Sequence, residues 1–484
     1  MRRKPFQTEP SLVRSPLSRP WTRRRALTGL GAAVAGGALL VLGTRTARAT
    51  ATVAAPRTLK RFMTEAAGSA DGSSWPNAMA IDQLGEAINT AEPGAAFLIG
   101  FDPADLRPVA FKETGIRIRA SGTADRLIQL RAGLIGEDGG LAAPGDAELA
   151  PFFTSARPWS LALFAKKTGI PCYVAIERGA SHLYLAGFRV DGTTGDGFIK
   201  FRAGKDAPAT FANVRIAEIA ARNVGRVIET DKNAALTDLI VEDCRVSGIV
   251  RGFARFRKIS NSVLRNLDLD SANLDGGRRD VCQLIAVSAG DNLTFENVTL
   301  KNALNAQIKS DGKQGYVQGD GIVCERGTSN IVIRNCHGSG MGDGAFDLKS
   351  TNVTIEDSST DACKFGIRIW SEGTNVIRRC TLRNPVTRGK NHGACIQVSG
   401  TAEVIDSQLQ AGPGQAAISL QKLKNGNLPV VRMAGGAIQL DGDARLARST
   451  EGGTLHLEGV AVNGELRTET LVLKPAEGGG DDTE

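Results

Sequence analysis

Between residues 320 and 370 lie several acidic and basic side chains that could bind a metal ion or transfer a proton. The acids are Asp320, Asp343 and Asp347, and the bases are Lys349, Lys364 and Arg368. Carboxylate oxygens are the ligands that a hard cation such as Ca²⁺ prefers, so the three aspartates are candidate metal ligands. A partly desolvated lysine can lose its proton and act as a base, whereas an arginine stays protonated.

Three more side chains in this part of the chain are candidates for binding a substrate. They are Trp370, Lys390 and His392. An indole ring offers a flat apolar face and can also contact cations, while Lys390 and His392 can supply positive charge. We therefore predict that these residues contact a substrate near the acidic and basic group.

A repeat of 22 residues determines where these side chains lie. Segments 329–336, 351–358 and 374–380 alternate apolar and polar residues in the same way, and equivalent positions in them are 22 residues apart. After each segment a Gly-containing stretch leads to a second short strand, as at 366–369. The strands are short and no helical segment separates them, which excludes a βαβ array. A constant period of this length predicts a solenoid.

A coil of 22 residues with two or three short strands resembles the right-handed parallel β-helix of pectate lyases and related polysaccharide enzymes. The resemblance implies an all-β fold whose coils stack about 4.8 Å apart, so that equivalent residues form columns. We also expect an N-terminal capping helix, because Ile81, Leu84, Ala87 and Ile88 recur at the helical period. The predicted division of the chain is a signal peptide at 1–49, an N-terminal cap region at 50–110, the parallel β-helix at 111–425, further coils or a cap at 426–476, and a disordered tail at 477–484.

The outward residues resemble a site motif of polysaccharide lyase family nine. That motif places Asp-Asp-Gly-x-Asp on one coil, another Asp on the coil before, and a lysine on a later strand. This chain has Asp-Gly-Ala-Phe-Asp at 343–347, Asp320 earlier, and Gly-Ile-Arg-Ile at 366–369. In the family the aspartates hold calcium, which binds a uronate carboxylate, and the lysine removes the C5 proton. The resemblance therefore implies that Asp320, Asp343 and Asp347 bind calcium and that Arg368 stands at the position of the base.

The chain departs from this motif in three places, one of which is an extra residue between Asp343 and Asp347. Gly342 stands where the family has its first acid, and Arg368 replaces the lysine. Lys349 and Lys364 are therefore alternative candidates for the base. The same aspartates also suit tight turns, because Asp before Gly caps a turn backbone.

The function predicted from these features is a lyase that cleaves an acidic, uronate-containing polysaccharide by β-elimination. A glycoside hydrolase or an epimerase on the same fold is an alternative. A carbohydrate-binding or envelope protein without catalysis is a further alternative. The residues leave the particular glycan and the oligomeric state open.

The N-terminal 49 residues carry ten Arg or Lys and one acid, which leaves 59 − 10 = 49 basic and 51 − 1 = 50 acidic groups beyond them. The basic pI therefore belongs to this leader, and nucleic-acid binding is not predicted.

The same leader has the features of an export signal. Arg23, Arg24 and Arg25 precede an apolar, Gly/Ala-rich stretch, and Ala47-Arg48-Ala49 follows. This order predicts a signal of the twin-arginine type and a periplasmic or extracellular location, with an uncleaved membrane anchor as the alternative. No membrane span is predicted after signal removal.

The eight cysteines contain no Cys-x-x-Cys pair, so neither zinc nor a thioredoxin-like motif is indicated. In the predicted solenoid, Cys244, Cys336 and Cys380 fall into one column. Cys336 and Cys380 would lie two coils, about 9.6 Å, apart, which is too far for a disulfide. Packing in the core is therefore the preferred interpretation, with disulfides as the alternative.

Overall fold

The structure is a computed structural model that describes residues 54–111, 115–142, 151–155, 172–193, 197–204, 207–274, 281–308, 314–389 and 392–475. The chain divides into two units, of which the second is Val53–Glu484, and the fold below is that of the second unit. The predicted signal peptide, the tail at 477–484 and Lys390 lie outside the described residues. No helix among the described residues is long and apolar enough to cross a membrane.

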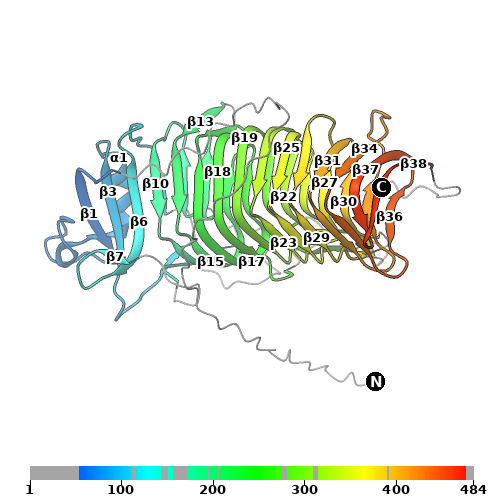
Figure 1. The fold of residues 1–484 in the computed structure, drawn as a ribbon. Coiled ribbons are helices and arrows are strands. Elements are labelled where there is room, and N and C mark those ends of the chain that lie inside the picture. Colours follow the sequence, from blue (N-terminus) through cyan, green and yellow to red (C-terminus); the bar gives the residue numbers. More distant parts are fainter. Residues whose placement is uncertain are drawn as a thin grey trace, which may run out of the picture. The chain divides into compact units, whose positions relative to one another are not determined.

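The second unit is a parallel β-helix whose strands stack coil on coil from β1 to β37 (Figure 1). Most coils contribute strands to three parallel ladders, which are called the first, second and third sheets below. Strands that belong to the first sheet alone are β1 (Thr58–Met63), β3 (Ala95–Phe101), β6 (Ile128–Ile135), β10 (Leu183–Ala186), β14 (Val214–Ala217), β25 (Thr351–Glu356), β28 (Asn375–Arg378), β31 (Thr401–Ile405) and β34 (Val430–Ala434). The second sheet contains β4 (Val109–Phe111), β8 (Phe153–Ser155), β11 (Arg189–Thr193), β23 (His337–Ser339), β26 (Ser359–Asp361), β29 (Thr381–Arg383), β32 (Gln408–Ala411) and β35 (Ala437–Leu440). The third contains β5 (Ile116–Ile118), β9 (Val174–Glu177), β12 (Ile199–Arg202), β24 (Gly344–Leu348), β27 (Phe365–Ile369), β30 (Ala394–Val398), β33 (Ala416–Leu420) and β36 (Arg445–Ser449).

Longer strands bend through the corners and so contribute to more than one sheet. They are β15 (Ala220–Thr230), β17 (Ile240–Phe256), β18 (Lys258–Asp270), β19 (Gln283–Lys301), β22 (Asp320–Arg334) and β37 (Gly453–Val462). Short strands β13 (Ala209–Ala212) and β16 (Ala234–Thr237) pair with each other beside one corner. The predicted 22-residue period is confirmed, because Val353 pairs with Ile331 in the coil before and with Asn375 in the coil after.

The corners between sheets are made by residues with left-handed backbone conformation. Asn330 (φ 53°) and Asn352 (φ 57°) occupy one such corner in successive coils. Asparagine tolerates this conformation better than most residues because its short side chain bonds locally. The Nδ2 of Asn352 donates to the Oδ1 of Asn330 at 3.2 Å, and Asn330 donates in turn to Asp291. Each corner is therefore tied to the one in the coil before it.

The interior is one continuous apolar core that extends along the coils from Phe62 to Val462. Apolar side chains fill its columns, such as Ile322, Phe346, Ile367 and Ile396, all of which are buried. All eight cysteines are buried and free. This confirms the prediction that cysteines pack in the core.

The N-terminal helix is shorter than predicted. A 3-10 turn, η2 (Ile81–Gln83), leads into α1 (Leu84–Asn89), which has only six residues. Leu84 and Ile88 are buried in the core as the pattern predicts. The role of a capping helix is not confirmed, because β1 forms the N-terminal edge of the first sheet and pairs with β3 and with β2 (Met79–Ala80). Another 3-10 turn, η1 (Trp75–Asn77), precedes β2.

Three antiparallel pairings depart from the parallel ladder. At the C-terminal end β38 (Glu465–Leu473) pairs antiparallel with β37, and near the N-terminus β7 (Leu141–Ala142) pairs antiparallel with β6. Between β19 and β22 a hairpin of β20 (Asn305–Ile308) and β21 (Gln314–Gln318) forms a separate two-stranded sheet. This hairpin contributes a residue to the site described next.

Candidate functional site

The predicted acidic and basic residues meet on the outer side of the third sheet. Asp320 opens β22, Asp347 lies in β24 and Arg368 lies in β27, which are consecutive strands of that sheet. Asp347 pairs directly with Arg368, and Arg368 pairs with Gln397 in β30. Asp343 and Lys364 occupy the turns that lead into β24 and β27. Successive coils thus place all five charged residues within one cluster.

Asp343 lies at the centre of this cluster. Its Oδ2 accepts a hydrogen bond from Nη1 of Arg368 at 2.6 Å. Its Oδ1 accepts one from the hydroxyl of Tyr316 at 2.8 Å, and Nζ of Lys364 is 3.6 Å from the same oxygen. Asp343 is 5% exposed, so water screens these interactions poorly and they are stronger than at the surface.

Arg368 is held on all sides. Besides Asp343, its Nε donates to Oε1 of Gln397 at 3.1 Å and lies 3.9 Å from Oδ1 of Asp347. Its guanidinium lies over the ring of Trp370, 4.5 Å from the centroid. Burial alone would lower the pKa of Arg368, but the charges of Asp343 and Asp347 raise it overall. Arg368 therefore stays protonated, which argues against its predicted role as a base.

Lys364 differs from every other cation of the cluster. It is 0% exposed, and within the described part of the chain its Nζ has no hydrogen-bond partner. The ammonium lies over the ring of Tyr316, 3.6 Å from the centroid. Burial lowers the pKa of Lys364 to about 8, although Asp343 opposes this shift. A neutral amine is therefore accessible to Lys364 near physiological pH.

Asp320 and Lys349 lie at the edge of the cluster. Asp320 has carboxylates as its charged neighbours, whereas Lys349 is paired with an acid. Asp320 is buried and accepts a hydrogen bond from the backbone N–H of Gly344 at 2.9 Å. Burial, followed by the charges of Asp343 and Asp347, raises the pKa of Asp320. Lys349 donates to Glu325 at 2.8 Å. Burial would lower the pKa of Lys349, but Asp347 and Glu325 raise it overall, so Lys349 is a poor candidate for the base.

The predicted substrate-binding residues are separated. Trp370 belongs to the cluster, because its Nε1 donates to Oδ1 of Asp347 at 2.6 Å. His392 is exposed, and its backbone carbonyl accepts a hydrogen bond from Arg448. Within the part of the chain that the structure describes, no contact joins its imidazole to the charged cluster. Lys390 lies outside the described residues.

The donor set does not suit a calcium ion as arranged here. Both oxygens of Asp343 face donors, and Oδ1 of Asp347 accepts from Trp370. The positive groups of Arg368 and Lys364 lie beside Asp343, where a cation would be repelled. Among the residues that the structure describes, no group of three or more His, Cys, Asp or Glu could hold a metal ion. Calcium binding by Asp320, Asp343 and Asp347 stays a prediction, and no step below depends on it.

Sequence reasoning did not include two members of the cluster, Tyr316 and Gln397. Gln397 could have been found, because aligning strand 366–369 with strand 394–398 places it directly after Arg368 in the same column. Tyr316 lies in the inserted hairpin, outside the repeat. Its only signal is that this tyrosine precedes Asp320 by four residues.

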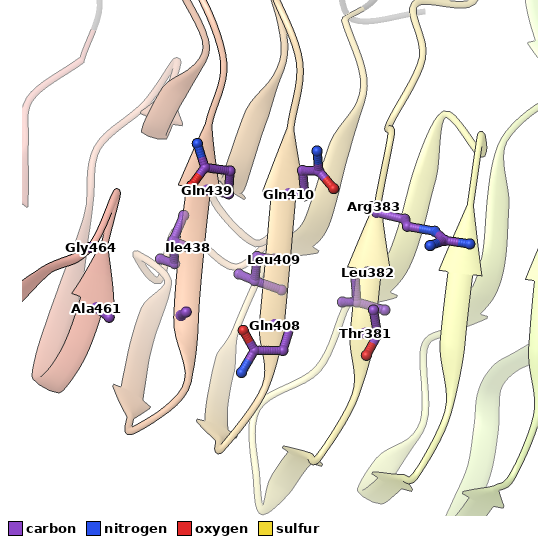
Figure 2. Close-up of a pocket in the computed structure, with 11 residues that line it drawn as sticks. Thr381, Leu382, Arg383, Gln408, Leu409, Gln410, Ile438, Gln439, Ala461 and Gly464 are labelled. Carbon is purple, nitrogen blue, oxygen red and sulfur yellow. The ribbon is translucent and has the colours of Figure 1, made fainter.

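A separate hollow of about 350 Å³ lies on the outer side of the second sheet (Figure 2). Gln408, Gln410 and Gln439 line it together with Thr381 and Arg383, and Leu409 and Ile438 form part of its floor. Figure 2 shows that these side chains come from neighbouring strands of successive coils. None of the predicted site residues lines this hollow.

The fold and the site can now be compared with known proteins. Residues 176–426, just over half of the chain, match the family described as "Right handed beta helix region". The chain belongs to this right-handed β-helix family. A search of curated proteins found no match.

Several solved structures are similar to this right-handed β-helix protein. The catalytic domain of a GH87 α-1,3-glucanase is 10% identical, with 76% of this chain and 64% of that chain covered and a TM-score of 0.42. An alginate lyase from Paenibacillus sp. str. FPU-7 is 13% identical, with 83% and 99% covered and a TM-score of 0.32. An exopolygalacturonase from Thermotoga maritima is 11% identical, with 79% and 85% covered and a TM-score of 0.34. This chain thus spans less than two thirds of the glucanase domain, and these identities are too low to transfer a substrate.

Proposed function

We propose that this right-handed β-helix protein cleaves an acidic, uronate-containing polysaccharide by β-elimination. The observation that carries the proposal is Lys364, a fully buried lysine whose Nζ lacks a hydrogen-bond partner among the described residues. Burying an ammonium in this way costs several kcal/mol. A group held in such an unfavourable protonation state beside other charges is typical of functional sites.

In this proposal Lys364 is the general base. Its neutral amine removes the proton on C5 of a uronate, the electrons of that C–H bond form the C4=C5 double bond, and the C4–O bond breaks. Arg368 binds the uronate carboxylate and stabilises the negative charge that develops next to C5. Because its pKa is raised, Arg368 keeps its charge throughout.

Tyr316 is the proposed general acid, which gives its proton to the departing glycosidic oxygen. Burial, followed by the charge of Asp343, raises the pKa of Tyr316, so its hydroxyl is protonated at neutral pH. Asp343 accepts the hydrogen bond of this hydroxyl and also holds Arg368. Asp343 therefore positions both the acid and the carboxylate-binding arginine.

The proposal requires that Tyr316 move away from Lys364 when substrate binds, because its ring covers the ammonium. Tyr316 belongs to β21, which pairs only with β20 among the described strands. Movement of this residue would break no hydrogen bond of the three stacked sheets. Substrate binding would thus displace Tyr316 and expose Lys364.

Hydrolysis of a glycosidic bond is a second candidate, and the environment of Asp320 favours it. Burial, followed by the charges of Asp343 and Asp347, raises the pKa of Asp320. This is the direction that a general acid needs, while a neighbouring aspartate would activate water. Two carboxyl groups with different protonation states are what such enzymes use. The difference between the two candidates lies in the product, since only β-elimination creates a C4=C5 double bond.

The test uses purified protein and a panel of uronate polysaccharides, each with and without a chelator. Ultraviolet absorbance of the unsaturated uronate reports elimination, and reducing ends without absorbance report hydrolysis. We expect Lys364→Gln to abolish the absorbance, and Lys301→Gln, on the outer side of the second sheet, to retain it. Binding without product on every glycan would instead support a carbohydrate-binding protein without catalysis.

We also propose that the protein is exported by the twin-arginine route to the periplasm or beyond. The support is the Arg23-Arg24-Arg25 run followed by an apolar stretch. Replacing Arg23, Arg24 and Arg25 by lysine should leave the protein in the cytoplasm. Unchanged secretion of this variant would contradict the proposal.

A further inference from the structure

Two outward columns of the third sheet, one of which contains Arg368, continue toward the C-terminus. In one column Arg368 pairs with Gln397, Gln397 with Ser419, and Ser419 with Arg448. The strand β36, which holds Arg448, is therefore three coils beyond Arg368. At a strand spacing of about 4.8 Å this separation is about 14 Å.

The second column leads to another arginine on the same strand. Phe365 pairs with Ala394, Ala394 with Ala416, and Ala416 with Arg445. Phe365, Ala394 and Ala416 pack together outside the main core, so this column also faces outward. Both outward columns thus end in an arginine on β36.

Between Arg368 and these two arginines the columns hold only small or neutral side chains. They are Ala394, Ala416, Ser419 and Gln397, whose Nε2 donates to Oε1 of Gln421. No carboxylate in these columns stands between the charged cluster and β36. An acidic polymer lying along them would meet positive charge at both ends of the stretch and no like charge within it.

Arg445 and Arg448 have no acidic partner within the part of the chain that the structure describes. Arg448 is partly buried; its Nη2 donates to the backbone carbonyl of His392, and its Nε lies 3.4 Å from Oγ of Ser419. Burial, followed by the like charge of Arg445, lowers the pKa of Arg448 to about 10.

Some other partly buried arginines of the protein are neutralised, although Arg189 is buried over the ring of Phe152 without an acidic partner among the described residues. Arg215 and Arg265, for example, both bind Glu242. A buried positive charge is normally paired, because leaving it unpaired costs free energy. Arg448 is partly buried and Arg445 is exposed on the same strand, so both are available to bind the negative charge of a ligand.

We infer that Arg445 and Arg448 form a second anion-binding subsite that takes a carboxylate of the same acidic glycan, three coils from Arg368. This inference rests on the proposed function for the class of ligand, but not for the chemistry at Lys364. The glycan would lie along the axis of the β-helix, with one uronate at Arg368 and another at β36. A pyranose unit is similar in length to the spacing between neighbouring coils. Short oligosaccharides would therefore not reach from Arg368 to Arg448.

The test is equilibrium binding of a length series of uronate oligosaccharides, measured by calorimetry. For the double variant Arg445→Gln/Arg448→Gln we expect affinity to fall about tenfold or more, because the charge-assisted hydrogen bonds to the uronate carboxylate are lost. The loss should be confined to oligosaccharides long enough to span three coils. The variant Arg445→Gln/Arg448→Lys, which keeps one positive charge, should bind more tightly than the double glutamine variant.

The matched control is Arg432→Gln, which removes an exposed arginine from β34 in the first sheet. It should bind every oligosaccharide as the unaltered protein does. Equal affinity of the double variant and the unaltered protein for long oligosaccharides would overturn the subsite, as would absence of uronate binding to the unaltered protein.

Failure of the subsite and failure of the proposed function give different results. If the unaltered protein binds long oligouronates through Arg445 and Arg448 but forms no product, the subsite stands and the catalytic proposal fails. If product forms and the double variant binds long chains normally, the subsite fails and the catalytic proposal stands.

Discussion

Arg368 and Asp343, which belong to neighbouring coils, form a buried ion pair with Nη1 of Arg368 2.6 Å from Oδ2 of Asp343. The two side chains are 8% and 5% exposed. Breaking a buried pair by removing one partner costs more than breaking a surface pair, because the remaining charge stays buried. This pair therefore links the stability of two coils to the arrangement of the candidate site.

Replacing Asp343 by asparagine keeps the shape of the side chain and removes its charge. We expect Asp343→Asn to lower the free energy of unfolding by about 3 kcal/mol, because Arg368 is left without its main partner. Urea unfolding followed by circular dichroism measures this change. Asp357→Asn, which breaks the exposed pair with Arg379, should have little effect; equal effects of both variants would contradict a special role for the buried pair.

Lys364 should give the protein a distinctive dependence of stability on pH. Its pKa is lowered from 10.5 to about 8 by burial, so between these pH values the unfolded chain binds the additional proton. The contribution of Lys364 to stability must therefore rise with pH between about 8 and 10.5. We expect Lys364→Met to remove this rise, which is measured as the difference between the two proteins in urea midpoints at several pH values. Parallel curves for the two proteins would show that Lys364 has an ordinary pKa.

The rate of catalysis should depend on the protonation state of Lys364. If neutral Lys364 is the base, kcat/KM for glycan cleavage should rise with pH and level off above an apparent pKa near 8. Initial rates of appearance of the unsaturated product over a pH series provide the measurement. A rate that is independent of pH between 6 and 9 would argue for another base.

Tyr316→Phe separates the hydroxyl of Tyr316 from its ring. The ring can still cover Lys364, but the hydrogen bond to Asp343 and the proposed proton donor are lost. We expect activity to fall by about 10²-fold or more, with a loss of stability of only about 1 kcal/mol. Tyr184→Phe is the matched control, since Arg215 lies over the ring of Tyr184 in a similar way. An active Tyr316→Phe variant would exclude Tyr316 as the acid.

The arrangement around Asp343 also predicts the response to metal removal. Because Arg368 and Lys364 supply positive charge beside this carboxylate, we expect a chelator to leave both the melting temperature and any cleavage activity unchanged. Added calcium should then have no effect on the melting temperature. A drop in melting temperature with chelator that calcium reverses would instead support the predicted calcium site.

The sequence by itself determined the architecture, because side chains in a stacked coil alternate between the core and the outside with a fixed period. The 22-residue step located inward residues such as Phe346 and Ile355, both 0% exposed. It also placed Asp347 and Arg368 in one outward column, where they pair directly. The same step put the cysteines in the core.

Only the tertiary structure decided what the outward charges do. The period cannot position Tyr316, since it lies in a hairpin inserted between two coils, and this ring buries Lys364. The alternation of residues along a strand predicts which side chains point outward. It does not predict which of them are covered by other side chains. The choice between Arg368 and Lys364 as base depends on burial and on the neighbours of Asp343, which are properties of residues brought together from separate coils.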